Sequence, residues 1–262
     1  MIKKNTRQLE FDRDLVLADA RKEIARRLEQ PARRSFLRRS LTLGGLSLLS
    51  GCAITDENSV ETALMQVSRF NDKVQGWLFD SNRLAPTYPD SMITRPFPFN
   101  AYYGEDEIRE IEEEGYRLEV TGLVADKRTW TLAELRAMPQ ADQVTRHICV
   151  EGWSAIGKWG GVPFADFLRR VGADLSAKYV GFKCADDYYT SIDMPTALHP
   201  QTLLTLTYDS QPLPPRYGFP MKLRMPTKLG YKNPKHIQAI FVTNTYPGGY
   251  WEDQGYNWFG GS

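Results

Sequence analysis

The spacing of apolar residues predicts helices in three parts of the chain. Between residues 59 and 80, apolar side chains recur every three or four positions, as on one helix face: Val60, Leu64, Val67, Phe70, Val74, Trp77 and Leu78. We expect that face to pack in a core. Thr131 and Glu134 have the spacing of a capping box, which opens a short helix. A third helix is expected over residues 164–171, ended by Gly172.

Short apolar or alternating runs predict strands along the rest of the chain. They cover residues 116–124, 144–150, 179–184, 203–208, 221–225 and 237–243. Prolines at positions 86, 89, 96 and 98 exclude a helix or a central strand in the segment between the first helix and the first strand. Many strands with a few short helices indicate an α+β fold with a mixed sheet.

The formal net charge of +1 hides two unequal parts. Residues 1–51 contain 12 Lys or Arg and 6 Asp or Glu, whereas residues 52–262 contain 21 and 26. In the basic part, a twin arginine at 33 and 34 precedes an uncharged run, residues 40–51, which is shorter than the about 20 residues of a membrane-spanning helix. This pattern is typical of an export signal, although a basic helix that runs into a buried one has the same pattern.

Two short motifs refine the export hypothesis. Arg33-Arg34-Ser35-Phe36-Leu37 resembles a twin-arginine (Tat) signal, and Leu49-Ser50-Gly51-Cys52 resembles a lipoprotein cleavage site. The resemblance implies export by the Tat translocase to the periplasm or the outer face of the cytoplasmic membrane, with a lipid on Cys52 as an anchor. Because Tat carries folded proteins, it also implies a buried cofactor. We divide the chain into an export signal with a long lead-in (1–51), a helix with a Pro-rich linker (52–94) and a main domain (95–262).

The stretch Arg146–Ser154, which reads RHICVEGWS, carries the clearest candidate chemistry. A predicted strand delivers Cys149 to a Gly-containing loop, where a thiolate could ligate a metal or act as a nucleophile. The three cysteines of the chain exclude a disulfide-dense scaffold, although Cys149 and Cys184 could form one bridge. The histidines and cysteines lack the paired spacing of a zinc site. The near-neutral charge gives no reason to expect a nucleic-acid partner.

The CVEGWS motif around Cys149 resembles the sulfite-oxidase-type molybdopterin domain, in the bacterial periplasmic branch that includes the catalytic subunit of methionine sulfoxide reductase. Five further segments in the same order support the resemblance over about residues 95–245: Phe99–Tyr103, Trp159–Pro163, Leu198–Leu204, Leu213–Leu223 and Lys228–Lys232. Trp159–Pro163 resembles the family's Trp-X-Gly-X-Pro turn before a helix. Leu198–Leu204 resembles the family's segment with a His-Pro pair. The resemblance implies a mixed, β-rich molybdopterin-binding fold for residues 95–262.

The resemblance also implies site residues. Cys149 would be the protein ligand of molybdenum, and the residues that would hold or approach the pterin are Asn100, Tyr103, His147, Cys184, Tyr217, Lys222, Gly230, Tyr231 and Lys232. Lys222 and Lys232 could neutralise the pterin phosphate, helped by backbone N–H groups near Gly230 and by His236. His147 could equally be a structural histidine, and Cys184 a small buried residue.

Two departures from the family pattern prevent transfer of a substrate. Tyr217 stands where the methionine-sulfoxide branch has Asn, and Lys222 stands where it has Arg, which keeps the charge but loses the bidentate fork. Tyr189 and Asp193 could handle substrate protons, or Tyr189 could pack and Asp193 cap a helix. The aromatic C-terminal stretch, residues 246–262, could dock a partner or lie across the domain as a cover.

Together these features predict an exported molybdenum-molybdopterin oxidoreductase that catalyses two-electron oxygen-atom transfer on a sulfite- or sulfoxide-like substrate, small or protein-bound. The chain has no Cys-X-X-Cys-His haem motif and no iron–sulfur spacing, so its electrons would be exchanged with a separate haem protein, either a membrane cytochrome or a soluble carrier. The alternatives are a non-catalytic cofactor-binding or electron-relay protein, and a structural lipoprotein with a Cys149–Cys184 bridge.

Overall fold

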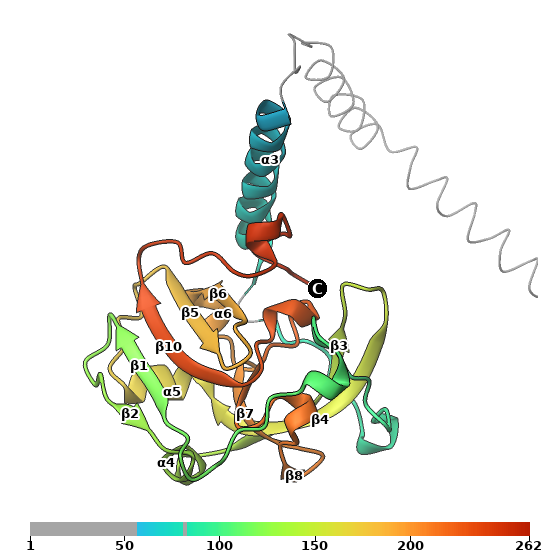
Figure 1. Ribbon diagram of the computed structural model, residues 1–262, viewed down its shortest axis with the longest axis vertical. Helices are drawn as coiled ribbons and strands as arrows, with labels where there is room; N and C mark the ends of the chain where they lie inside the picture. The colour runs from blue at the N-terminus through green and yellow to red at the C-terminus, as the bar shows by residue number, and fades with distance from the viewer. Residues whose placement is uncertain (1–56, 81–82) are drawn as a thin grey trace, which may run out of the picture. The chain divides into compact units, whose positions relative to one another are not determined.

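Two five-stranded β-sheets dominate the structure, a computed structural model that describes residues 57–80 and 83–262 (Figure 1). We call the first the β10 sheet; its strands, in spatial order, are β2 (Thr129–Trp130), β1 (Leu118–Gly122), β10 (Ile237–Thr243), β5 (Tyr179–Cys184) and β6 (Tyr189–Asp193). Strand β1 runs parallel to β10, and the other pairs are antiparallel. The sheet is therefore mixed, as the sequence predicts.

The second sheet, which we call the β4 sheet, is antiparallel throughout. It contains β3 (Ala141–Ile148), β4 (Ser154–Pro163), β7 (Leu203–Tyr208) and β8 (Gln211–Pro212), and β9 (Lys222–Arg224) also pairs with β7. The helices are α3 (Glu57–Leu78), α4 (Leu132–Ala137), α5 (Phe164–Arg170) and α6 (Met194–Ala197), and the 3₁₀ turns are η1 (Asp90–Met92), η2 (Glu105–Glu107), η3 (Pro215–Tyr217), η4 (Gly230–Lys232) and η5 (Glu252–Gln254). The α+β fold class is confirmed.

The main core lies between the two sheets and includes residues of both. Leu118, Val180 and Ile240 from the β10 sheet and Leu204 and Leu223 from the β4 sheet are fully buried in one apolar cluster. Helix α5 adds its apolar face to this cluster, as predicted, and Thr131 caps α4 by accepting a hydrogen bond from the Glu134 backbone N–H. The fold therefore rests on burial of apolar area in the usual way.

Strand β4 was not predicted by the sequence pattern, which indicated a turn at residues 159–163. The strand contains glycines at 157, 160 and 161, and such residues normally weaken a strand. The structure explains Gly161: a Cβ at that position would lie 2.0 Å from the carbonyl oxygen of Leu204, so the close approach of β4 and β7 requires glycine. The glycine-rich segment is thus a central strand and not a turn.

Helix α3 has the predicted bounds within two residues, but its predicted packing is wrong. The exposed fractions of its apolar side chains are 56–83% for Leu64, Val67, Phe70, Trp77 and Leu78. The contacts with the rest of the fold come from the other side of the helix and the residue after it: Asp72 accepts a hydrogen bond from the Phe259 backbone N–H, and Phe79 packs edge-on against the Phe259 ring. Periodicity located the helix but not the face that is buried.

The predicted export signal and Cys52 lie outside the described residues, so the division of the chain at residues 51 and 94 stays a prediction. Within the described ranges, none of the helices combines the length and the apolarity that a bilayer-spanning segment needs.

Candidate active site

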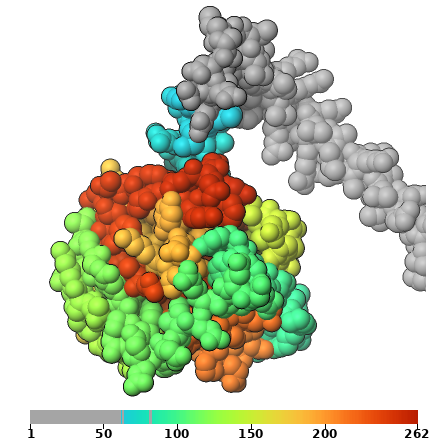
Figure 2. All heavy atoms as spheres, viewed as in Figure 1, coloured from blue at the N-terminus to red at the C-terminus, as the bar shows by residue number. Residues whose placement is uncertain are grey.

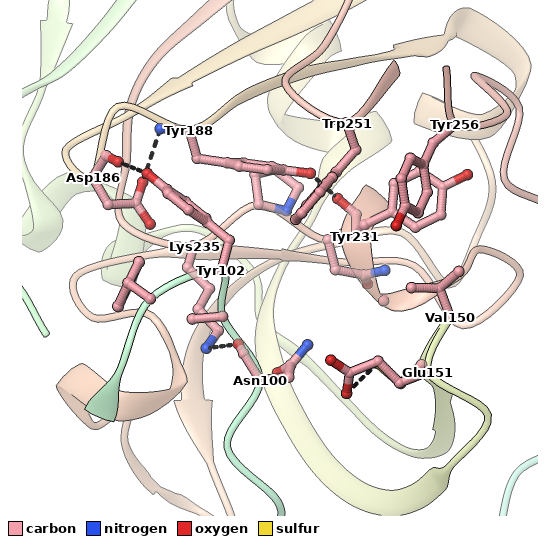
Figure 3. A pocket seen from close by; sticks show the side chains of 16 residues that line it. Asn100, Tyr102, Val150, Glu151, Asp186, Tyr188, Tyr231, Lys235, Trp251 and Tyr256 are labelled. Atoms are coloured by element: carbon pink, nitrogen blue, oxygen red, sulfur yellow. Dashed lines mark hydrogen bonds between the residues drawn. The ribbon is translucent and has the colours of Figure 1, made fainter. Parts of the chain in front are cut away.

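A pocket opens where five chain segments meet (Figure 3), and Cys149 is one of its lining residues. The segments are residues 100–103, the loop after β3, residues 186–188 between β5 and β6, the η4 region with the residues that follow it, and the C-terminal residues 251–256. The lining residues are Asn100, Ala101, Tyr102, Tyr103, Cys149, Val150, Glu151, Asp186, Tyr188, Gly230, Tyr231, Asn233, Pro234, Lys235, Trp251 and Tyr256. Five of the predicted site residues, Asn100, Tyr103, Cys149, Gly230 and Tyr231, come together here.

A tight loop holds Cys149 directly after β3. The Cys149 backbone N–H donates to the Trp153 carbonyl at 2.9 Å, the Gly152 N–H donates back to the Cys149 carbonyl at 3.2 Å, and Gly152 has a φ of +92°, which favours glycine. Burial raises the pKa of the Cys149 thiol, so a thiolate here requires a cation as partner. Cys149 and Cys184 are both free thiols, which contradicts the disulfide-bridged alternative.

Next to the pocket, five basic side chains form what we call the basic cluster: His147, Lys222, Arg224, Lys235 and His236. All five are buried, and only Lys235 lines the pocket. Burial lowers the pKa of Lys222 well below its usual value, and the positive charges of Lys235 and Arg224 lower it further. Burial also lowers the pKa of Lys235 to about 8, an effect that the Asp186 carboxylate opposes. Burial also lowers the pKa of His147 and of His236, so the cluster groups basic side chains whose charged forms become favourable when an anion is near.

Several nitrogen atoms of the basic cluster have no hydrogen-bond partner within the described part of the chain. His147 Nδ1, His236 Nε2 and Arg224 Nε are buried without a hydrogen-bond partner there. Lys222 Nζ lies over the face of the Trp159 ring, 4.8 Å from the ring centroid. Buried cations without counter-charges are strongly unfavourable, so this region fits an anionic group such as the phosphate of molybdopterin. The residues present therefore fit the predicted cofactor.

The pterin-side contacts are also consistent with the prediction. Asn100 Nδ2 lies 3.3 Å from His147 Nε2, and the Asn100 carbonyl accepts a hydrogen bond of 2.5 Å from Lys235 Nζ. A Cβ on Gly230 would lie 2.7 Å from His147 Nε2, so a side chain would not fit there. The N–H groups of Gly230 and Tyr231 open the η4 turn, where backbone donors have no acceptor inside the turn. Asn100, Gly230 and Tyr231 could therefore bind the cofactor edge.

Three predicted cofactor residues lie elsewhere. The ammonium group of Lys232 uses its three donors on Thr190 Oγ1, the Ser191 carbonyl and the Glu252 carboxylate. Tyr217 packs in a second apolar cluster, and its hydroxyl donates to the Phe97 carbonyl at 2.9 Å. Cys184 is buried in the main core. None of the three lines the pocket, because each already has a structural environment.

The predicted proton-handling residues also lie outside the pocket. The Tyr189 hydroxyl donates to Asp253 Oδ2 at 2.6 Å, and Asp193 Oδ1 accepts from the Thr196 backbone N–H at 3.2 Å, which caps α6. The structure thus shows the capping alternative for Asp193, whereas Tyr189 is exposed and hydrogen-bonded to the tail rather than packed. The neighbouring Tyr188 lines the pocket instead, and its hydroxyl donates to the Tyr231 carbonyl at 2.5 Å.

The sequence pattern did not single out several pocket residues. Tyr102 and Asp186 lie on one side, where the Tyr102 hydroxyl donates to the Asp186 carbonyl and the pKa of Tyr102 is raised, by burial first, to about 12. Lys235 belongs to none of the sequence motifs, yet it lines the pocket. Trp251 and Tyr256 come from the C-terminal stretch, which has no motif, so only the folded chain places them here.

Comparison with known proteins defines the class. The chain matches the family model described as "Oxidoreductase molybdopterin binding domain" over residues 105–251, more than half of its length, and it belongs to that family. It is 75% identical, over the full length of both chains, to a protein of Azospira oryzae named putative protein-methionine-sulfoxide reductase subunit YedZ1. It is 32% identical over 161 residues to the protein-methionine-sulfoxide reductase catalytic subunit MsrP of Ralstonia nicotianae; the match covers 55% of this chain and 49% of that protein.

A solved structure supports the fold. The sulfane dehydrogenase SoxCD from Paracoccus pantotrophus aligns with 53% of this chain and 40% of its own, with a TM-score of 0.50 and 18% identity. The predicted sulfite-oxidase-type fold and the molybdenum-molybdopterin cofactor are confirmed, and the chain is an enzyme, a molybdopterin-dependent oxidoreductase. The non-catalytic alternative is therefore not retained.

Proposed function

We propose that this oxidoreductase reduces sulfoxides, with methionine sulfoxide as the representative substrate. The observation that carries the proposal is the buried Cys149 thiol between an uncompensated basic cluster and an aromatic pocket wall. The Cys149 thiol fits the metal, the basic cluster fits the phosphate, and the aromatic wall fits an organic substrate. The names of the relatives from Azospira and Ralstonia, which refer to methionine sulfoxide, support the same substrate class.

The overall reaction is R₂SO + 2 e⁻ + 2 H⁺ → R₂S + H₂O, in which the S–O bond breaks and the oxygen leaves as water. When bound, the molybdenum cofactor supplies a centre that cycles by two electrons. Cys149 would ligate the metal, the basic cluster would hold the phosphate, and Asn100 with the Gly230 and Tyr231 backbone would orient the pterin. The tyrosines that line the pocket would limit the water around a bound substrate.

The electrons would come from a separate haem protein, either a membrane cytochrome or a soluble carrier. The sequence has no haem-attachment or iron–sulfur motif of its own, and the Azospira relative is named as a subunit, which supports a partner. We further propose that the chain works on the periplasmic side of the cytoplasmic membrane after Tat export, with Cys52 lipidated. The support for this location is the sequence of residues 33–52.

Metal analysis and turnover of the full chain, purified from its own host, test the proposal. We expect stoichiometric molybdenum, together with reduction of methionine sulfoxide by chemically reduced viologen. Sulfite oxidation and N-oxide reduction serve as comparison reactions. A protein that carries molybdenum but turns over sulfite and no sulfoxide would overturn the substrate, and a protein without molybdenum would overturn the entire assignment of the site. Mass determination of the N-terminal fragment tests lipid on Cys52.

A further inference from the structure

The C-terminal tail, which we define as residues 246–262, forms one wall of the pocket. Trp251 and Tyr256 line it, with their ring centroids 5.0 Å apart, and Tyr256 lies 5.8 Å from the Tyr231 ring. Figure 3 shows these rings grouped across the pocket from Asn100 and Glu151. The match to the family model ends at residue 251, so Tyr256 belongs to a part of the chain that the family does not define.

A buried ion pair fixes this wall to the body of the domain. Glu252, between the two ring-bearing positions, accepts hydrogen bonds from Lys232 Nζ and, at 2.7 Å, from Thr190 Oγ1. The side chains of Lys232 and Glu252 are each 1% exposed. Lys232 belongs to η4, the same turn whose backbone lines the pocket. The ion pair therefore couples the cofactor side of the pocket to the tail.

Strand β6 holds the tail at further points. The Ser191 hydroxyl donates to the Gly248 carbonyl at 2.7 Å and accepts from Trp258 Nε1 at 2.9 Å. In Figure 2 the red tail and the orange-yellow residues near β6 lie side by side on the visible face. Contacts on both sides of Trp251 and Tyr256 restrict the two rings, which is the condition for a specificity-determining wall.

The chemistry of the pocket favours an uncharged organic substrate over an inorganic dianion. The carboxyl groups of Glu151 and Asp186 line the pocket, and a dianion such as sulfite would meet their negative charge. Lys235, the cation among the described lining residues, already donates to the carbonyls of Asn100 and Arg216. Aromatic rings, by contrast, bury apolar substituents and make favourable contacts with sulfur.

We propose that Trp251 and Tyr256 recognise the organic substituents of an uncharged sulfoxide, and that the Lys232–Glu252 ion pair positions them. This inference rests on the sulfoxide reductase activity proposed above. The tail is then more than a cover: two of its rings set substrate specificity, and Glu252 is a positioning residue that acts through them.

Steady-state kinetics of the cofactor-loaded protein test the inference with two substrates, a methionine-sulfoxide peptide and dimethyl sulfoxide. Trp251→Ala and Tyr256→Ala should each raise KM for the peptide about three- to tenfold, as expected for loss of a sulfur–aromatic contact and its apolar area, and should change kcat less. The preference for the peptide in kcat/KM should fall. The matched control is Tyr246→Ala, because the Tyr246 ring contacts Tyr179 and Trp258 and does not line the pocket.

Glu252→Gln separates positioning from stability. It should lower the preference for the peptide in the same direction as Trp251→Ala, at unchanged molybdenum content, and Glu252→Asp should restore part of that preference. A Glu252→Gln variant that only unfolds at a lower temperature, with unchanged preference, would overturn the positioning role. If the unaltered enzyme reduces sulfoxides but Trp251→Ala and Tyr256→Ala behave like Tyr246→Ala, the inference fails alone. If the unaltered, molybdenum-loaded enzyme reduces no sulfoxide, the proposed function fails and the inference with it.

Discussion

Two groups of buried cations in this domain differ in what balances their charge. Lys232 is 1% exposed, and the Glu252 carboxylate of the C-terminal tail balances its charge, whereas its neighbour Lys228, 2% exposed, donates to the neutral Phe259 carbonyl at 2.9 Å. In the basic cluster, the guanidinium of Arg224 donates to neutral acceptors such as the Arg146 carbonyl, and Lys222 lies against the Trp159 ring.

The presence or absence of a carboxylate partner separates a cation that stabilises the fold from cations that bind a ligand. A buried ion pair supplied by the protein is complete when the chain folds, whereas a buried cation without a carboxylate is unfavourable until an anion arrives. Lys232 therefore belongs to the fold, and the basic cluster belongs to the cofactor. Burial alone does not distinguish the two groups, but the source of the counter-charge does.

The largest expected effect is at the metal ligand beside the basic cluster. Cys149→Ser should lower sulfoxide reduction by more than about 100-fold, because loss of a ligand should exceed the usual effect of losing one of its supporting contacts. The absorption or paramagnetic-resonance spectrum of the metal should change as well. Cys184→Ala is the matched control, since Cys184 lies in the core and outside the pocket lining. An unaltered spectrum in Cys149→Ser would refute ligation by this residue.

The second prediction concerns the cation that belongs to the fold. Lys232→Met should lower the free energy of unfolding by about 3–5 kcal/mol with or without cofactor, because it leaves the Glu252 carboxylate buried without its partner. Denaturant titration measures this change. Adding Glu252→Gln to Lys232→Met should recover part of the loss. A loss seen only in the cofactor-loaded protein would place Lys232 in the other group.

The third prediction has opposite signs in the two states of the protein. Lys222→Met should raise the free energy of unfolding of the cofactor-free protein by about 1–4 kcal/mol, because an uncompensated buried charge is replaced by an apolar side chain of similar length. The same change should reduce the molybdenum content of protein from its own host. Destabilisation of the cofactor-free form would show that the protein itself balances Lys222, which would remove the difference between Lys222 and Lys232.

The smallest effect is in the pH dependence of stability. Burial lowers the pKa of Lys228 to about 7 from the ordinary 10.5. Between these values the unfolded chain binds more protons than the folded one, so the free energy of unfolding should rise with pH across that range. Lys222 and Lys235 add to the slope in the cofactor-free protein. In the cofactor-free protein, Lys228→Met should remove only part of the dependence of the unfolding free energy on pH. In the cofactor-bound protein, it should remove a larger share of that dependence. Equal slopes with and without Lys228 would contradict its depressed pKa.

Much of the fold was predictable because periodicity and capping are local properties. The strands at residues 179–184, 203–208 and 237–243 have the predicted bounds, and α4 begins at its capping box. Strand β4 was not predictable in this way, since Gly161 serves a contact with Leu204, 43 positions further along the sequence. The exposed face of α3 was missed for the same reason: periodicity cannot tell what packs against a helix.

The site residues, too, differ in whether the sequence could predict them. Asn100, Cys149 and Gly230 lie in motifs with fixed order, and the structure brings them together. Lys232 looked like a phosphate ligand because its charge is visible in the sequence, but its partner Glu252 is 20 positions away and becomes adjacent only in the fold. Pocket residues from the tail carry no local pattern, so nothing in the linear sequence could assign them.

The position of the pocket wall near the end of the chain orders the events of biosynthesis. A ribosome that has not yet added residue 256 holds a nascent chain whose basic cluster is synthesised but whose wall of Trp251 and Tyr256 is not. The substrate wall is therefore added after every residue that would hold the cofactor has been synthesised. A truncation after residue 250 would remove this wall and the carboxylate partner of Lys232, but would leave Cys149 and the basic cluster in the chain.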